Sequence, residues 1–79
     1  MEKSQHTRAY LEVTRALRAA REAAGLTQAE VAKELGVYAT FVSKVESGER
    51  RVDVVELSRI CQVYGVELVA FLRSAGLCG

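Results

Sequence analysis

The sequence of 79 residues contains no proline and no tryptophan, and it has only two cysteines. Cys61 and Cys78 are too few for a disulfide framework or for a four-ligand structural zinc site. No window of about 18 residues is free of charged side chains, which excludes a transmembrane helix. The first residues lack the apolar segment of a secretory signal, so we expect the protein to be cytoplasmic.

Neither sign of charge dominates the composition. Eleven Lys and Arg stand against ten Asp and Glu, which gives a net charge of +1 that does not by itself indicate a nucleic-acid partner. Hydrophobic residues make up 49% of the chain, too many for a disordered protein. The length predicts a single domain over residues 1–79, and the absence of proline with few alternating β-branched segments predicts an all-α fold.

Glycines at 25, 36, 48, 65 and 76 divide the chain wherever the helical spacing of apolar residues breaks. The expected helices span about 7–24, 28–35, 39–47, 53–64 and 67–74, with frayed ends at 1–6 and 75–79. Thr27 with Glu30, and Asp53 with Glu56, have the spacing of capping boxes at the second and fourth helices. The expected core comprises Val13, Leu17, Ala32, Leu35, Val42, Val45, Leu57, Ile60 and Leu68, and Val54, Cys61 and Tyr64 are also expected to point inward.

The second and third predicted helices are joined by very few residues. Gly36 lies where a short turn requires a positive φ, which a residue with a Cβ adopts only at some cost. Helices joined in this way cross at about 90–120°, and the small side chain of Ala32 permits their close approach. This pattern predicts a helix-turn-helix over residues 28–47.

The sequence resembles the lambda-repressor-like, Cro-type helix-turn-helix family over about residues 13–72. The matching residues are Leu26-Thr27-Gln28-Ala29-Glu30-Val31-Ala32, Leu35-Gly36-Val37, Val42-Ser43-Lys44-Val45-Glu46-Ser47-Gly48, Arg50, Leu57, Ile60, Tyr64-Gly65-Val66 and Leu68. The resemblance implies a bundle of five helices that binds operator DNA as a dimer, with the third helix in the major groove. Tyr38 departs from the pattern, because a Ser or Thr normally caps the third helix at this position, so we expect that cap to be lost or replaced.

A recognition helix over 39–47 would present its N-terminal residues to base edges. Val42 and Val45 must face inward, which leaves as candidate base contacts Ala39, Thr40, Ser43 and Lys44. Lys44 could donate to guanine O6 and N7, although a solvated surface lysine is the alternative. Phe41 is expected to be partly buried.

Candidate phosphate contacts surround that helix: Thr27, Gln28, Ser47, Arg50 and Arg51. The first two begin a helix whose free backbone amides can hold a phosphate, and the resemblance assigns a backbone contact to the glutamine. Simple solvent exposure is the alternative for Gln28 and for each arginine. The resemblance also implies a structural ion pair between Arg21 and Glu46, which would fix the recognition helix to the scaffold.

A dimer surface is expected in the C-terminal part. Leu68, Phe71 and Leu72 provide the inward stripe of the last helix, so Val69 is left facing outward. The apolar residues without an obvious partner in the chain are Val55, Val69, Ala70 and Leu77. Scattered exposed apolar groups are the alternative explanation.

We therefore predict a sequence-specific transcriptional regulator, not an enzyme, that binds a palindromic DNA operator as a homodimer. A phage-type repressor or a restriction–modification controller protein fits a domain without an appended ligand-binding unit, and RNA polymerase is a candidate further partner. The alternative is an antitoxin or adaptor module that uses the fold to bind a protein. No cofactor, metal or membrane is expected, because His6 and the two cysteines lack a catalytic or metal-binding context.

Overall fold

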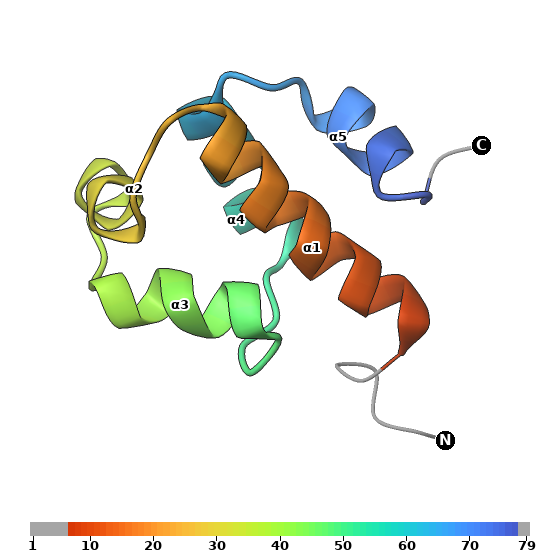
Figure 1. Ribbon diagram of the computed structural model, residues 1–79, viewed down its shortest axis with the longest axis horizontal. Helices are drawn as coiled ribbons and strands as arrows, with labels where there is room; N and C mark the ends of the chain where they lie inside the picture. Colours follow the sequence, from red (N-terminus) through yellow and green to blue (C-terminus); the bar gives the residue numbers. More distant parts are fainter. Residues whose placement is uncertain (1–6, 78–79) are drawn as a thin grey trace.

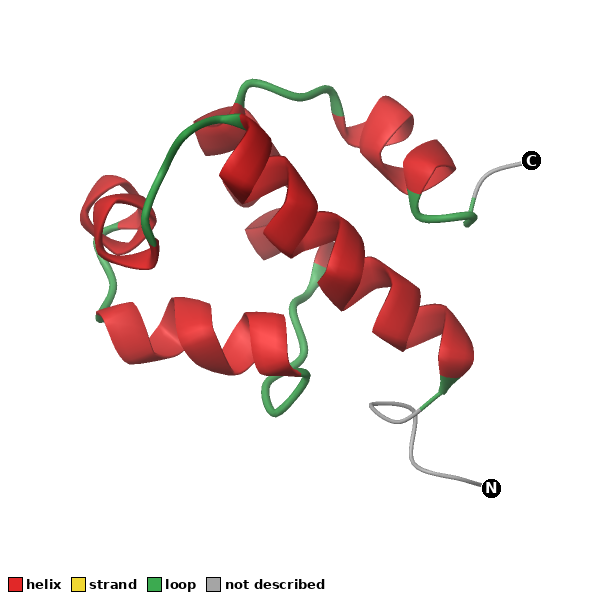
Figure 2. Ribbon diagram, viewed as in Figure 1, coloured by secondary structure: helices red, strands yellow, loops and turns green. Residues whose placement is uncertain are grey.

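Five α-helices follow one another through residues 7–77, the part of the chain that the computed structural model describes (Figure 1). They are α1 (Arg8–Ala23), α2 (Gln28–Leu35), α3 (Ala39–Ser47), α4 (Val54–Tyr64) and α5 (Leu68–Ser74). No strand occurs within these residues (Figure 2), so the expected all-α fold is confirmed. The connections are short, from three residues (36–38 and 65–67) to six residues (48–53).

Helix α1 runs diagonally across the molecule and contacts α3 and α5 (Figure 1). Helix α2 packs against both α3 and α4, and α4 packs against α5. Every helix therefore buries one face against at least one neighbour, as short helices must in order to be stable in water. The paired helices α2 and α3 occupy one end of this arrangement, where they leave one side of α3 open.

Side-chain caps fix the start of four of the five helices. Thr7, Thr27, Asp53 and Glu67 each accept a hydrogen bond from the backbone N–H three residues further on, and both expected capping boxes are present. Tyr38, the N-cap of α3, makes no side-chain capping bond, and the residue is 86% exposed. The cap expected to be missing or replaced is thus missing, and α3 alone begins without this stabilisation.

The turn between α2 and α3 depends on backbone conformation. Gly36 has φ +74°, and the N–H of Val37 donates to the carbonyl of Ala32 at 2.9 Å, which closes the end of α2. A Cβ at Gly36 would meet no atom within 4 Å, so the glycine is required for its left-handed backbone and not for space. Ala32 is 3% exposed, in keeping with a close approach of the two helices.

The core contains most of the residues expected there. Leu17 and Val31 are almost completely buried at its centre, and Leu68 is only partly buried against its edge. The expectation that Val54 points inward is wrong, because this residue is 66% exposed. Leu57, one turn later in α4, is buried. The neighbouring helices therefore cover α4 from its second turn onward and leave its first turn exposed.

The C-terminal end also differs from the expectation. Residues 75–77 were expected to be frayed, but Ala75 is buried in the core. The N–H of Leu77 donates to the carbonyl of Leu72 at 2.9 Å, and the N–H of Gly76 to that of Arg73 at 3.0 Å. These bonds close the last turn of α5 and hold residues 75–77 in place. The other expected frayed residues, 1–6 and 78–79, lie outside the described part.

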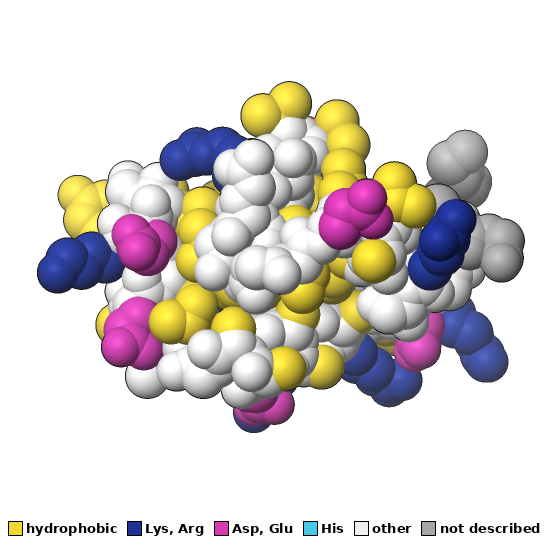
Figure 3. Space-filling model, turned by 90° about the horizontal axis from the view of Figure 1, so that it is seen from above, with side chains coloured by type: hydrophobic (Ala, Val, Ile, Leu, Met, Phe, Trp, Pro, Cys, Tyr) yellow, Lys and Arg dark blue, Asp and Glu magenta, His cyan; other side chains and the backbone are white. Residues whose placement is uncertain are grey.

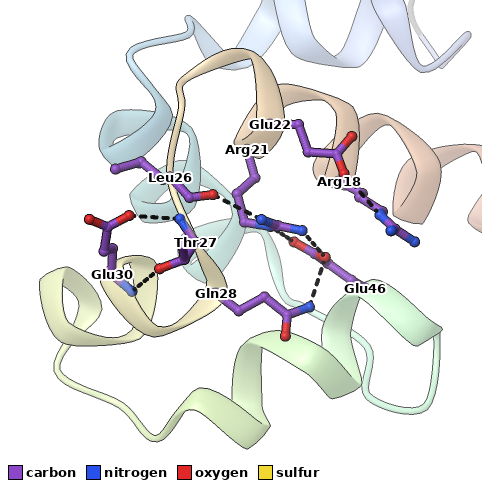
Figure 4. A network of polar contacts seen from close by, with 8 residues as sticks. All are labelled: Arg18, Arg21, Glu22, Leu26, Thr27, Gln28, Glu30 and Glu46. Atoms are coloured by element: carbon purple, nitrogen blue, oxygen red, sulfur yellow. Dashed lines mark hydrogen bonds and ion pairs between the residues drawn. The ribbon is translucent and has the colours of Figure 1, made fainter.

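One ion pair links α1 to α3 (Figure 4). Arg21 Nε and Nη2 donate to the two carboxylate oxygens of Glu46 at 2.6 and 3.1 Å, and Nη1 donates to the carbonyl of Leu26 at 2.8 Å. The Arg21 side chain is 12% exposed and that of Glu46 is 6% exposed. A bidentate pair with so little access to water holds both groups in one geometry, and it fixes α3 relative to α1.

Replacing Glu46 by Ala should lower the free energy of unfolding by about 2–4 kcal/mol, because Arg21 would remain buried without a counter-charge. Glu22→Ala is the matched control, since Arg18–Glu22 is a solvent-exposed pair on α1 (66% and 58% exposed). The control should change stability by no more than about 0.5 kcal/mol. Urea denaturation followed by circular dichroism measures both, and equal effects would show that the buried pair has no special role.

Replacing Tyr38 by Ser should stabilise the protein by about 0.5–2 kcal/mol, because the serine hydroxyl can cap the first turn of α3. Thr27→Ala removes an existing cap at α2 and should destabilise by a similar amount. Thermal unfolding of the two variants tests the argument. A lower melting temperature for Tyr38→Ser would mean that the tyrosine contributes to folding by a contact other than a cap.

Candidate nucleic-acid interface

Helix α3 has two different sides. Val42 and Val45 are buried in the core, whereas Thr40 and Lys44 are exposed on the opposite side and Ala39 is exposed at the start of the helix. Ser43 lies between these sides and is half-buried. The helical repeat therefore brings the four expected base-contact residues onto the open surface of α3 or to its edge.

The exposed surface of α3 carries one ammonium group and several small side chains. No carboxylate within residues 7–77 lies within 4.0 Å of the Lys44 ammonium, so its three N–H donors are not used by an ion pair there. Thr40 offers a hydroxyl and a methyl group, and Ala39 offers a methyl group. The hydroxyl of Ser43 donates to the carbonyl of Thr40 at 3.1 Å, which orients it along the helix.

Gln28 connects the start of α2 to the buried ion pair between Arg21 and Glu46. Its Nε2 donates to Oε1 of Glu46 at 3.0 Å, so the same carboxylate accepts bonds from α1 and from α2 (Figure 4). The amide nitrogen carries a second hydrogen that can be donated to another acceptor. The sequence did not predict this contact, because the two residues are 18 positions apart and no local periodicity relates them. The neighbouring Thr27 is exposed, and its hydroxyl oxygen accepts the N–H of Glu30.

The last residue of α3 and the loop after it carry the remaining candidate phosphate contacts. The Ser47 hydroxyl lies within hydrogen-bonding distance of the Lys44 carbonyl (3.1 Å) and of the Glu49 carboxylate (3.0 Å). Arg50 donates to both carboxylate oxygens of Glu56 at 3.2 and 3.1 Å. Its guanidinium also lies 4.5 Å from the centre of the Phe41 ring, which is partly buried as expected.

Arg51 has a different environment from that of Arg50. It is exposed, and no carboxylate within residues 7–77 forms an ion pair with it. Its guanidinium lies 4.1 Å from the centre of the Tyr10 ring. Sequence reasoning did not identify Tyr10, because a residue in the first turns of α1 has no periodic relation to a loop about 40 positions later.

Burial and hydrogen bonds set the protonation states around this surface. The carboxylate of Glu56 accepts from Arg50 and from the Asp53 N–H, which lowers the pKa of Glu56 and raises that of Arg50. The hydrogen bond to Glu46 raises the pKa of Arg21. Burial raises the pKa of Tyr64 to about 12 and also raises that of the Cys61 thiol, so both remain neutral at pH 7. Cys61 therefore behaves as a small buried hydrophobic residue.

The expected dimer residues are all on the surface. Val55 is 65% exposed, Val69 45% and Leu77 49%, and Ala70 is also exposed. Seen from above, hydrophobic side chains gather along the middle of the face on which α5 lies, and Lys and Arg lie mostly toward its two ends (Figure 3). Within residues 7–77, Val55, Val69 and Leu77 therefore leave apolar surface uncovered.

Other kinds of site have little support in the described part. No group of three or more potential metal ligands lies together within residues 7–77. None of the helices there is long and apolar enough to cross a membrane. His6 and Cys78, for which no catalytic or metal-binding role is predicted, lie outside the described residues.

Residues 12–73 match the protein family described as a helix-turn-helix domain. An XRE-family like protein from Pseudomonas syringae pv. tomato str. DC3000 is 41% identical, with a TM-score of 0.81 over 86% of this chain and 83% of that one. The clp gene regulator ClgR from Corynebacterium glutamicum is 28% identical, with a TM-score of 0.77 over 82% of this chain and 69% of that one. A search of the curated proteins gives no match. The chain therefore belongs to the Cro- and lambda-repressor-like helix-turn-helix family, whose members are DNA-binding transcriptional regulators.

Proposed function

We propose that the protein recognises a palindromic DNA operator as a homodimer, with α3 in the major groove of each half-site. The observation that carries this proposal is the open side of α3, where Lys44 has no ion pair within the described residues and the helix is fixed from behind by Glu46. Base edges would be read by Lys44, Thr40, Ser43 and Ala39. The similarity to a clp gene regulator supports a role in controlling genes.

Contacts to the DNA backbone would come from both sides of α3. On one side, Thr27 and Gln28 begin α2, where backbone N–H groups and the free amide hydrogen of Gln28 can meet a phosphate. On the other side, Ser47 is the last residue of α3 and Arg51 lies in the loop that follows, where the guanidinium of the neighbouring Arg50 is already bound by Glu56. Contacts of this kind determine the register of the protein on the duplex and make binding depend on salt.

A dimer would supply the discrimination that one domain lacks. A single module buries roughly 600–1,000 Å² on DNA, which is small for selecting one site among many. Two copies related by a two-fold axis would place their recognition helices about 34–36 Å apart on successive major grooves. The exposed apolar residues Val55, Val69, Ala70 and Leu77 are the surface that we assign to this contact.

The regulator would act without catalysis. Its effect on transcription would follow from its own concentration and from the arrangement of its operators, as in a repressor or a controller protein. This activity places it in the cytoplasm, where RNA polymerase is available as a further partner. An antitoxin or adaptor role would instead require a protein partner and would leave the α3 surface without a DNA ligand.

Lys44→Ala should weaken binding to the preferred operator by about 1–3 kcal/mol and should weaken binding to unrelated DNA less, because a base contact is lost. Arg51→Ala is the comparison, since Arg51 makes no bond to Glu46 and loss of a phosphate contact should weaken both duplexes alike. Selection from random DNA, followed by binding titrations over a range of salt concentrations, measures these effects. Equal losses for Lys44→Ala on all duplexes would make it a phosphate contact, and no selected sequence at all would contradict the proposed function.

The free protein should be a dimer at tens of micromolar, and Val69→Glu should shift it toward the monomer, because two carboxylates would enter an apolar contact. Glu12→Ala, on the exposed surface of α1, is a control that should leave the dimer unchanged. Sedimentation equilibrium measures both. A wild-type protein that stays monomeric and binds DNA without cooperativity would refute the dimer, and an intact Val69→Glu dimer would place the contact elsewhere.

A further inference from the structure

The loop of residues 48–53 contains two adjacent arginines, of which Arg50 forms an ion pair and Arg51 forms none within residues 7–77. The charge of Arg50 is neutralised by the two oxygens of Glu56, and Arg50 Nη1 also donates to the carbonyl of Arg51 at 2.8 Å. Most of its donors are therefore used within the chain. Arg51 has no such partner within residues 7–77, and its guanidinium lies instead against the Tyr10 ring.

Tyr10 contacts this loop in three ways. It projects from α1 and is 7% exposed, so its ring has a fixed position in the domain. Its hydroxyl accepts the N–H of Val52 at 3.3 Å and lies 3.4 Å from the carbonyl of Arg50, to which it can donate. Its ring lies 4.1 Å from the guanidinium carbon of Arg51. One side chain thus holds the backbone on both sides of Arg51 and also the Arg51 side chain itself.

Stacking on a ring leaves the donors of a guanidinium available. The attraction acts through the flat face of the group, whereas its N–H donors point outward in the plane. A guanidinium held by one face can therefore still form two parallel hydrogen bonds to a phosphate. Because its position is already restricted, less conformational entropy is lost when the phosphate binds.

We propose that Tyr10 is a positioning residue for DNA binding, which holds Arg51 ready to contact a backbone phosphate, while Arg50 maintains the loop. This inference rests on the proposed function and deepens it, because it gives different roles to two adjacent arginines that were both candidate phosphate contacts. The loop is attached directly to the recognition helix, since the N–H of Arg50 donates to the carbonyl of Lys44 at 3.1 Å. Tyr10 consequently connects α1 to the loop that follows α3.

The test uses the full chain and two duplexes, the operator selected from random DNA and an unrelated sequence. Arg51→Ala should weaken binding to both and should reduce the magnitude of the slope of log K against log salt by about 0.9, the value for one phosphate. Tyr10→Leu should weaken binding about twofold to fivefold, the range that corresponds to an exposed cation–π contact. The double variant should bind no more weakly than Arg51→Ala alone, because the tyrosine acts through the arginine.

Two further variants separate positioning from folding. Tyr10→Phe keeps the ring and should keep the wild-type salt slope, whereas Arg50→Ala should leave the slope within error. In NMR spectra of the free protein, the Arg51 side-chain protons should be shifted upfield by the ring in the wild type and in Tyr10→Phe, and not in Tyr10→Leu. Titration at stoichiometric concentrations corrects every variant for its folded fraction.

The possible results separate the positioning role of Tyr10 from DNA binding itself. If Tyr10→Leu weakens binding equally with and without Arg51, or if Arg50→Ala and not Arg51→Ala reduces the salt slope, the positioning role is refuted while DNA binding stands. Absence of the upfield shift in the wild type also refutes it. If the wild-type protein binds neither duplex, the proposed function itself fails.

Discussion

The carboxylate of Glu46 is the contact on which the placement of the recognition helix depends. It accepts hydrogen bonds from Arg21 on α1 and from Gln28 on α2, so three helices meet at one buried group. Apolar packing through Val42 and Val45 is non-directional and would tolerate small rotations of α3. A bidentate ion pair does not tolerate them, because its hydrogen bonds require one orientation. The side of α3 that faces outward is thus determined by a bond on its inner side.

The distribution of ion pairs allows a nearly neutral protein to present cations at the proposed DNA-binding surface. Its net charge is +1, and several arginines are paired with carboxylates of their own neighbourhood, as in Arg15–Glu12 and Arg18–Glu22 on α1. Lys44 and Arg51, like some cations elsewhere on the surface, have no such ion pair within the described residues, and these two lie before and after the C-terminal end of α3. The position of unpaired cations, and not their total number, is what a phosphate backbone encounters.

Local signals were sufficient to predict most of the fold from the sequence. The helices, the capping box at Thr27 and most core residues follow from spacing within a few positions, since caps and helical periodicity are local properties. Val54 was misplaced because periodicity identifies a stripe but not where the neighbouring helices end. The pairing of Arg50 with Glu56 and its contact with Phe41 were missed for a related reason. Such contacts depend on how the loop is folded back onto α3 and α4, which no period in the sequence encodes.

The short connections between the helices have a consequence for the rate of folding. Helices α2 and α3, and likewise α4 and α5, pack against each other across connections of three residues, so part of the native contacts close only small loops. Small loops lose little entropy on closing, and helical domains with such topology fold in microseconds to milliseconds. The chain has no proline, so no slow isomerisation step delays it. Folding in this range is much faster than the synthesis of the chain, to which a ribosome adds about 5–20 residues per second. The time that a new copy needs to fold therefore does not limit how quickly regulation responds to synthesis.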